Sequence, residues 1–334
     1  MLNTSTILVT GGTGSFGQKF VKMTLEKYNP KKIIIYSRDE MKQWDMANKF
    51  NHDKRLRFFI GDVRDKERLY RALDGVDYIV HAAAMKIVPA AEYNPFECVK
   101  TVIHGAMNVV DAAIDKGIKR VVALSTDKAC NPINLYGATK LCSDKIFVAA
   151  NSYVGGNETR MAVVRYGNVM GSRGSVIPFF RSIAKTGILP ITDARMTRFM
   201  ITLEQGVELV WHAFDDMVGG EIYVKKIPSM KVVDVAKVIV PDAKLDFIGI
   251  RPGEKLHEVM ISVEDARNTF EYKDHYKILP QIHEWSADPE RIANGKPCEE
   301  GFSYASDNNI EWMTSDELKS WVDTEYASLA KEKE

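Results

Sequence analysis

The sequence predicts an α/β fold in which a doubly wound parallel sheet is followed by a smaller C-terminal domain. Over the first half of the chain, short β-branched runs alternate with longer amphipathic stretches. The short runs are almost continuously apolar, as expected of parallel strands covered by helices on both faces. A glycine-rich loop directly follows the first of these runs and opens the first helix, as in dinucleotide-binding sheets of the Rossmann type.

The strands and helices follow from these patterns in chain order. The strand candidates are Thr6–Thr10, Lys32–Tyr36, Leu56–Ile60, Tyr78–His81, Arg120–Ser125 and Met161–Tyr166. Helical patterns such as Phe16–Tyr28 lie between them. After Val169, glycines and prolines interrupt the pattern, and substrate loops usually lie beyond this point of such a sheet. We therefore assign residues 1–169 to the dinucleotide domain, with 200–240 returning to it, and residues 170–199 and 241–334 to the smaller domain.

The composition excludes several classes of protein. The 334 residues contain 45 Lys plus Arg and 45 Asp plus Glu, so a broad nucleic-acid-binding surface is not expected. No apolar run reaches the roughly 18 residues that span a bilayer, and the first residues lack the apolar core of a signal peptide. The four cysteines are scattered without a C-x-x-C pair, which argues against a zinc site or a disulfide framework. We expect a cytoplasmic protein without metal, nucleic acid or membrane as partners.

The loop after the first strand reads TGGTGSFG over residues 10–17. Glycines at three spaced positions permit a tight turn, close approach of a pyrophosphate and close packing of helix on strand. The N-terminus of the following helix adds unpaired N–H groups and a partial positive charge. The predicted contacts with the cofactor are Gly11, Thr13, Gly14, Ser15, Phe16 and Gly17.

The end of the second strand predicts which dinucleotide is bound. Sites for NAD usually place an acidic residue there, but this sequence has Ser37 and then Arg38. A guanidinium suits a ribose 2′-phosphate, and Lys42 adds a second positive charge one turn later. NADP is therefore predicted over NAD; the alternative is that both cations are solvated surface charges.

Two further strand ends contribute to the predicted cofactor site. Asp62-Val63 follows the third strand, where the carboxylate of Asp62 is expected to meet the adenine amino group. The small side chains of Ala82 and Ala83 follow the fourth strand and leave room for the nicotinamide half. The alternative for these alanines is close packing alone.

Tyr136 and Lys140 are four residues apart, which places them on one face of a helix beyond the strand that ends in Ser125-Thr126. A phenol with an ordinary pKa of about 10 is a poor base at neutral pH. A lysine ammonium and an oxidised nicotinamide nearby both favour its phenolate. We predict that Tyr136 takes a proton from a substrate hydroxyl, with Lys140 and Thr126 beside it.

This arrangement resembles the extended short-chain dehydrogenase/reductase superfamily. The stretch STDKA at 125–129, Asn131-Pro132 and LYGATK at 135–140 are similar to the inverting UDP-N-acetylglucosamine 4,6-dehydratases, whose strand-end slot carries Asp-Lys. The resemblance extends over essentially the whole chain, through AMK at 84–86, RYGNV at 165–169, GSRGSVIP at 171–178, MTRF at 196–199, GIRPGEK at 249–255 and, more weakly, GFSY at 301–304.

The resemblance implies a lyase that uses NADP⁺ to oxidise C4 of UDP-N-acetylglucosamine and then eliminates water across C5 and C6. Lys128 would be the C5 base and Asp127 the acid for the C6 hydroxyl, with hydride returning to C6 and inversion at C5. It further implies cofactor contacts from Lys86 and Val169, a homo-oligomer, and a pathway such as pseudaminic acid synthesis. The implied substrate contacts are Lys86, Asn168, Arg173, Gly174, Ser175, Val176, Arg198, Arg251, Glu254 and Tyr304.

Two positions depart from the superfamily pattern, and alternatives remain open. In the predicted amphipathic helix Pro95–Lys116, Val102 occupies the place of an asparagine that completes a proton relay in the superfamily. Ile87 stands where some relatives have histidine. A UDP-sugar 4-epimerase needs the Tyr–Lys pair but no acid–base pair, and Asp127 with Lys128 would then be a strand-end ion pair. A non-catalytic nucleotide sensor is the other alternative; such proteins commonly lack the Tyr–Lys pair. The 2-substituent of the sugar and the oligomer size stay undetermined.

Overall fold

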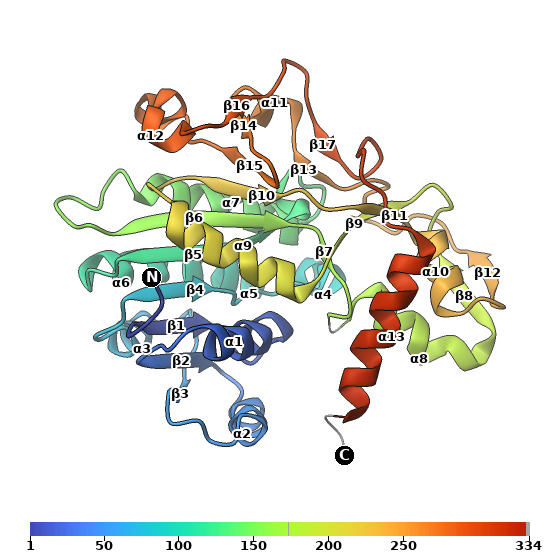
Figure 1. The fold of residues 1–334 in the computed structure, drawn as a ribbon, viewed down its shortest axis with the longest axis horizontal. Helices are drawn as coiled ribbons and strands as arrows, with labels where there is room; N and C mark the ends of the chain where they lie inside the picture. Colours follow the sequence, from blue (N-terminus) through green and yellow to red (C-terminus); the bar gives the residue numbers. More distant parts are fainter. Residues whose placement is uncertain (173, 332–334) are drawn as a thin grey trace. The chain divides into compact units, whose positions relative to one another are not determined.

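The computed structural model describes residues 1–172 and 174–331, which divide into two compact units (Figure 1). The larger unit consists of Met1–Tyr166, Leu203–Lys226 and Met260–Ser303. The smaller unit consists of Gly167–Thr202, Ile227–Val259 and the residues from Tyr304 on. The sequence assigned all of 241–334 to the second domain, whereas in the structure Met260–Ser303 belongs to the larger unit.

The larger unit is built on a ten-stranded sheet with the order β16-β14-β15-β10-β6-β5-β4-β1-β2-β3. The strands β3, β2, β1, β4, β5, β6 and β10 run parallel in the doubly wound order, which confirms the predicted fold class. Beyond β10, the strands β15, β14 and β16 are joined by antiparallel pairing. Their bounds are β1 Thr6–Thr10, β2 Lys32–Ser37, β3 Leu56–Ile60, β4 Tyr78–His81, β5 Arg120–Thr126, β6 Arg160–Tyr166, β10 Ile222–Lys225, β14 Thr269–Glu271, β15 His275–Ile278 and β16 Lys296–Pro297.

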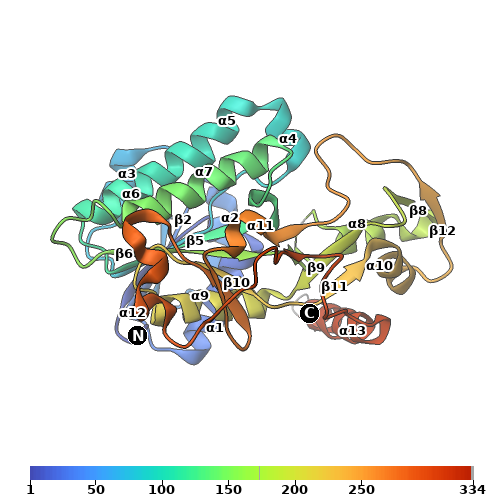
Figure 2. The ribbon, with the colours of Figure 1, turned by 90° about the horizontal axis from the view of Figure 1, so that it is seen from above.

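Helices cover both faces of this sheet. Figure 2 shows α3, α5, α6 and α7 together on one face, and α1 with α9 on the other. Because both faces are covered, every residue of β1 and of β4 is buried, and the strands can be apolar throughout. The helices are α1 Ser15–Lys27, α2 Glu40–Lys49, α3 Lys66–Ala72, α4 Val88–Tyr93, α5 Pro95–Val99, α6 Gly105–Asp115, α7 Leu135–Ala150, α9 Leu203–Asp216, α11 Val263–Ala266 and α12 Pro289–Ile292.

The predicted helix Pro95–Lys116 is interrupted. It consists of α5, a π-helical turn at Lys100–His104 and α6. Such turns are rare, and they often occur at functional sites. Here the turn contains Val102, which is buried against α7 in a cluster that includes Tyr136.

The smaller unit has its own strands and core. Strands β7 Asn168–Val169, β9 Thr197–Ile201 and β11 Ser229–Lys231 form one sheet, and β8 Ile188–Ile191 pairs in parallel with β12 Lys244–Phe247. Side chains such as Phe180, Leu189 and Leu318 form the core between α8 Val176–Ile183, α10 Val232–Ile239 and α13 Ser315–Lys331. The strands β13 Val259–Ile261 and β17 Tyr304–Ala305 lie where the chain passes between units. Within the described residues, no helix has the length and apolarity that crossing a membrane requires.

Candidate active site

The glycine loop joins β1 to α1 with the backbone that the motif requires. Gly11 has a φ of +64°, and a Cβ atom there would lie 3.0 Å from the backbone of Ala83. At Gly17 a Cβ would lie 2.3 Å from the carbonyl oxygen of Gly12, so only glycine lets the helix pack this closely on the loop. Gly14 is the N-cap of α1, and its N–H donates to the Gly11 carbonyl at 3.0 Å.

The first turn of α1 is suited to bind an anion. Its N-cap is a glycine without a side-chain hydrogen bond, and the first turn contains no acidic residue. The N–H groups of this turn are therefore left for a ligand, and the helix dipole adds a partial positive charge. The loop thus fits the pyrophosphate of a dinucleotide, as its glycine spacing predicts.

The end of β2 leaves one cation available for a ribose phosphate. The side chain of Arg38 is 61% exposed, and its guanidinium lies 3.7 Å from the Asp62 carboxylate. Lys42 instead pairs with Asp39 at 2.6 Å, and hydrogen bonds from Lys42 hold the pKa of Asp39 below its usual value. Ser37 is buried, and its hydroxyl accepts a hydrogen bond from the Gln43 amide at 3.0 Å. Arg38 is therefore better placed than Lys42 to meet a phosphate.

Asp62 is held by arginines. Arg64 donates to its carboxylate from Nε at 2.9 Å and from Nη2 at 2.6 Å. Partial burial raises the pKa of Asp62, but these hydrogen bonds and the charges of Arg64 and Arg38 outweigh it, so the pKa lies below the usual value. Val63 is buried, and its carbonyl accepts a hydrogen bond from Asn108 at 2.9 Å.

The chain after β4 is organised by a buried threonine that the sequence analysis did not single out. The Thr10 hydroxyl accepts hydrogen bonds from the N–H groups of Ala82 at 3.1 Å and Ala83 at 3.2 Å. It also lies 2.9 Å from Nδ1 of His81, a ring whose pKa burial and the nearby Lys140 lower to about 3. A neutral histidine and a threonine thus fix the backbone of Ala82 and Ala83. The available signal was a threonine at the end of the first strand, directly before the glycine loop.

The acid–base candidates lie where β5 ends. Asp127 is completely buried, while its neighbour Lys128 keeps a quarter of its side chain exposed. The Asp127 Oδ1 atom accepts hydrogen bonds from the Thr126 hydroxyl at 2.9 Å and from Lys128 Nζ at 3.1 Å. One carboxylate, one amine and one hydroxyl therefore form a single hydrogen-bonded group, which the structure brings together as the sequence predicted.

Tyr136 lies in the first turn of α7, close to this group. Burial raises the pKa of its phenol to about 12, while the positive charge of Lys128 and a hydrogen bond with Thr126 act in the opposite direction. Lys140 follows one turn later and is also buried, with Nζ donating to the Leu124 carbonyl at 2.6 Å. Burial lowers the pKa of Lys140, and the charge of Asp144 partly opposes this.

The two departures from the superfamily pattern differ in their surroundings. Val102 is 1% exposed and belongs to an apolar cluster with Ala91, Cys98 and Tyr136. Its side chain therefore packs beside the phenol rather than holding water, since valine has no polar side-chain atom. Ile87 is 61% exposed at the start of α4, outside this cluster.

Among the predicted substrate residues of the smaller unit, Arg198 donates its hydrogen bonds to the protein backbone. Arg198 is buried, and its guanidinium donates to the carbonyls of Thr197 at 2.6 Å, Leu256 at 3.0 Å and Lys255 at 3.0 Å. These bonds fix the loop 254–258 against β9. Arg198 thus organises this loop.

Arg251 and Glu254 form a bidentate pair with distances of 2.9 and 3.0 Å. The pKa of Glu254 is raised by burial, but its hydrogen bonds from Arg251 and the neighbouring charges keep it below the usual value. The Arg251 side chain is 64% exposed, so one edge of its guanidinium stays open to a ligand.

The other predicted contacts have varied environments. The Tyr304 hydroxyl is bonded to the backbone of Ile227, at 2.9 Å to N and 3.0 Å to O, and its ring packs on Phe199. Ser175 is the N-cap of α8, and its buried hydroxyl has no partner within the described residues. Asn168 and Val169 form β7, Val176 begins α8, Gly174 and Lys86 are exposed, and Arg173 lies outside the described residues.

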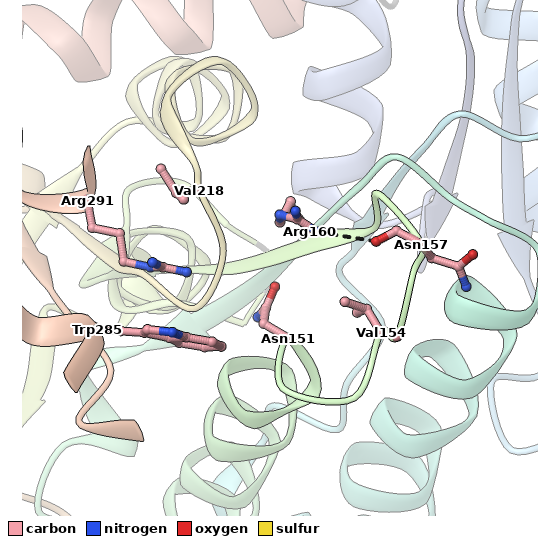
Figure 3. A pocket seen from close by; sticks show the side chains of 8 residues that line it. Asn151, Val154, Asn157, Arg160, Val218, Trp285 and Arg291 are labelled. Carbon is pink, nitrogen blue, oxygen red and sulfur yellow. Dashed lines mark hydrogen bonds between the residues drawn. The ribbon is translucent and has the colours of Figure 1, made fainter. Parts of the chain in front are cut away.

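A separate cavity of about 190 Å³ lies in the larger unit. Figure 3 shows the side chains that line it. It is lined by the end of α7 at Asn151, by Arg160 at the start of β6, and by Trp285 and Arg291. The 16 residues of α7 span about 24 Å, so this cavity is at the opposite end of the helix from Tyr136. Nucleotides bind at the carboxyl ends of parallel strands, and we do not assign this cavity to the nucleotide site.

Comparison with known proteins gives a matching family and named relatives. A family described as polysaccharide biosynthesis protein matches residues 7–280. The chain is 57% identical over 325 residues to a protein of Campylobacter jejuni subsp. jejuni serotype O:2 named UDP-N-acetylglucosamine 4,6-dehydratase (inverting), covering 95% of this chain and 97% of that protein.

Two solved structures share the fold. Pen from Bacillus thuringiensis matches with a TM-score of 0.90 at 35% identity, covering 98% of this chain and 99% of that chain. DesIV, a dTDP-glucose 4,6-dehydratase from Streptomyces venezuelae with NAD and TYD bound, matches with a TM-score of 0.69 at 25% identity, covering 75% and 86%. A homologue of this fold therefore binds a nicotinamide dinucleotide.

Proposed function

Because this chain belongs to the polysaccharide biosynthesis protein family, we propose that it is an NADP-dependent UDP-N-acetylglucosamine 4,6-dehydratase that inverts C5. The observation that carries this proposal is the buried Asp127 in hydrogen-bond contact with Lys128 at the end of β5. An epimerase needs only the Tyr–Lys pair, whereas eliminating water requires a base at C5 and an acid for the departing hydroxyl.

The cofactor is proposed to bind along the carboxyl ends of β1, β2 and β4. The N–H groups at the start of α1 would hold its pyrophosphate, and the exposed guanidinium of Arg38 favours the 2′-phosphate of NADP over NAD. When bound, NADP supplies the oxidation at C4 and the later reduction at C6. The small side chains of Ala82 and Ala83 leave the space beside this strand end open.

Tyr136 is proposed to take the proton of the C4 hydroxyl. Burial raises the pKa of Tyr136 to about 12, which is too high for a base at neutral pH, so a positive charge must favour the phenolate. Lys128, whose charge lowers the pKa of the phenol, is one such cation. Lys140, fixed on the Leu124 carbonyl, and the bound nicotinamide are proposed to add to it. Val102 packs by Tyr136 and keeps side-chain-bound water from this position.

The Asp127–Lys128 pair is proposed to perform the elimination. Moving one proton along the Nζ–H···Oδ1 hydrogen bond of 3.1 Å turns the ion pair into a neutral amine and a carboxylic acid. These are the forms needed, since the amine removes the C5 proton and the acid protonates the leaving C6 hydroxyl. Complete burial of Asp127 favours its neutral form, and the Thr126 hydroxyl keeps the carboxyl group oriented.

The nucleotide sugar is proposed to be held in part by the smaller unit. Arg251 has an exposed guanidinium edge for a diphosphate, and the unpartnered Ser175 hydroxyl offers a donor. Arg198 acts through the loop it fixes. Lys86, Asn168, Arg173, Gly174, Val176, Glu254 and Tyr304 stay in the proposed substrate set.

The test is to incubate purified protein with UDP-N-acetylglucosamine and NADP and to measure the mass of the nucleotide sugar. Loss of one water with formation of a ketone is expected. An unchanged mass with inversion at C4 would replace the proposal with the epimerase alternative.

A further inference from the structure

A second carboxylate lies on the same face of α7 as Lys140. Asp144 follows Lys140 by four residues, and both side chains are buried. The Asp144 Oδ2 atom accepts hydrogen bonds from the Ser125 hydroxyl at 2.7 Å and from Arg165 Nη2 at 3.3 Å. Asp144 therefore links α7 to the ends of both β5 and β6.

Arg165 extends this link to a more distant segment of the larger unit. Its side chain is 3% exposed, and Nη1 donates to the Met260 carbonyl at 2.8 Å. The same nitrogen lies 3.6 Å from the carboxylate of Asp265, which is 30% exposed in α11. The positive charge of Arg165 thus pairs with the carboxylate of Asp144.

The strand that Asp144 holds is the strand that carries the catalytic residues. Leu124, whose carbonyl accepts the Lys140 hydrogen bond, precedes Ser125, and Thr126 and Asp127 follow it. A shift of Ser125 would therefore move the Lys140 acceptor and the acid–base pair together. Fixing a strand end within a fraction of an ångström is a common requirement of catalytic geometry.

We infer that Asp144 is a positioning residue of the active centre, whose buried carboxylate fixes the end of β5 through Ser125 and places a negative charge one helical turn from Lys140. This inference rests on the proposed function, because it assumes that Tyr136 and Lys140 act in turnover.

The ionisable groups around Lys140 support the second part of this role. On α7 itself these are Asp144 and, one turn earlier, Tyr136. From β4, His81 faces it, and this ring is neutral at working pH because its pKa is about 3. From β6, Arg165 is positive and pairs with Asp144. Of the groups named on α7, β4 and β6, Asp144 carries the negative charge, and this charge opposes the burial that lowers the pKa of Lys140. Beyond the end of β5, the carboxylate of Asp127 is paired with Lys128.

The charge and the hydrogen bonds proposed for Asp144 predict that the pH–rate profile of Asp144→Asn is displaced along the pH axis. Turnover requires Lys140 to be protonated, so the alkaline limb of the pH–rate profile marks the loss of that proton. Removing a neighbouring opposite charge moves the alkaline limb to lower pH by about one unit. The acid limb also moves down, because the Asp144 charge raises the pKa of Tyr136. A purely structural loss would lower kcat without moving either limb.

Asp265→Asn is the matched control. It removes a carboxylate from the other side of Arg165, at 3.6 Å, without touching Lys140. We expect its pH limbs to coincide with those of the unmodified protein. An alkaline limb that stays in place in Asp144→Asn, or that moves equally in Asp265→Asn, would overturn the inference.

Asp144→Glu keeps the charge and covers the case in which Asp144→Asn does not fold. We expect the alkaline limb to stay in place while kcat falls, because the longer side chain displaces Ser125. A displaced limb in this variant would also overturn the inference. If the unmodified protein forms no dehydrated product, the proposed function fails instead, so the two failures are distinguishable.

Urea unfolding as a function of pH gives a readout that needs no turnover. Unfolded Lys140 keeps its proton to higher pH than folded Lys140, so stability rises with pH between the two pKa values. In Asp144→Asn this rise is expected to begin at about one pH unit lower. An onset identical to that of the unmodified protein would count against a charge on Asp144 acting at Lys140.

Discussion

Replacing Asp127 by asparagine tests the proposed elimination most sharply. The amide has nearly the same shape as the carboxyl group, but it cannot deliver a proton to the C6 hydroxyl. Asp127 is completely buried, with its carboxylate 2.9 Å from the Thr126 hydroxyl and 3.1 Å from Lys128 Nζ. No bulk water replaces it as an acid at this position, so the full contribution of the proton transfer should be lost.

The expected size follows from the chemistry of proton transfer. A positioned general acid contributes about 10²–10⁴-fold to a rate. This corresponds to about 3–5 kcal/mol of activation free energy. We expect the dehydration rate of Asp127→Asn to fall within this range, with little change in KM, because the substitution leaves the predicted binding residues in place.

The assay is the rate of water loss from UDP-N-acetylglucosamine, followed by mass spectrometry of the nucleotide sugar. The amount of NADP retained per protein and the urea midpoint are measured in parallel to show that the variant folds and binds its cofactor. Asp242→Asn, at an exposed position between α10 and β12, is the matched control and should leave the rate unchanged. A folded Asp127→Asn variant that dehydrates at the original rate would refute the assignment.

Three further substitutions test separate parts of the account. Arg38→Ala should weaken NADP about 10-fold relative to NAD in binding measurements, since a charged hydrogen bond to the 2′-phosphate is lost; an unchanged ratio would point to other phosphate contacts. Gly17→Ala places a Cβ 2.3 Å from a carbonyl oxygen of the phosphate loop and should lower the free energy of unfolding by about 1–3 kcal/mol in urea, unlike Gly156→Ala, where no atom lies within 4 Å. Tyr304→Phe removes two hydrogen bonds to Ile227 and should lower the free energy of unfolding by about 1–3 kcal/mol in urea; an unchanged free energy of unfolding would show that these bonds do not stabilise the protein.

Much of the larger unit is predictable from local pattern. The strands Thr6–Thr10, Leu56–Ile60 and Tyr78–His81 have the predicted bounds, because parallel strands give short, mostly apolar runs between helices. The phosphate loop and the Tyr136–Lys140 spacing are equally local signals. The residues that carry the proposed chemistry all lie in such short segments.

What the sequence does not predict depends on contacts between distant residues. The antiparallel strands β14, β15 and β16 are two to four residues long, and neither the pairing of β15 with β10 nor the pairing of these strands with one another has a local pattern. Pattern alone therefore assigned Met260–Ser303 to the smaller domain, whereas contacts group this segment with the larger unit. The π-helical turn at Lys100–His104 is likewise invisible in a sequence that reads as one amphipathic helix.

The candidate site likewise has features that the sequence predicts and features that only the structure shows. Arg38 follows β2 and Asp127 follows β5, as the strand pattern predicts, but the exposure of Arg38 and the burial of Asp127 are visible only in the structure. The sequence alone cannot show that Lys42 pairs with Asp39, since this depends on the geometry of one helix start. Nor does it show that the Tyr304 hydroxyl is bonded to a backbone segment far away in the chain.

The central claim is that this protein removes water from UDP-N-acetylglucosamine and inverts C5. The most direct measurement is an NMR spectrum of the product formed with NADP in deuterated water. The account predicts a 4-keto-6-deoxy sugar with deuterium at an inverted C5, because Lys128 removes that proton and solvent returns one on the opposite face. A product that retains its C6 hydroxyl and its C5 proton, with only C4 changed, would contradict it.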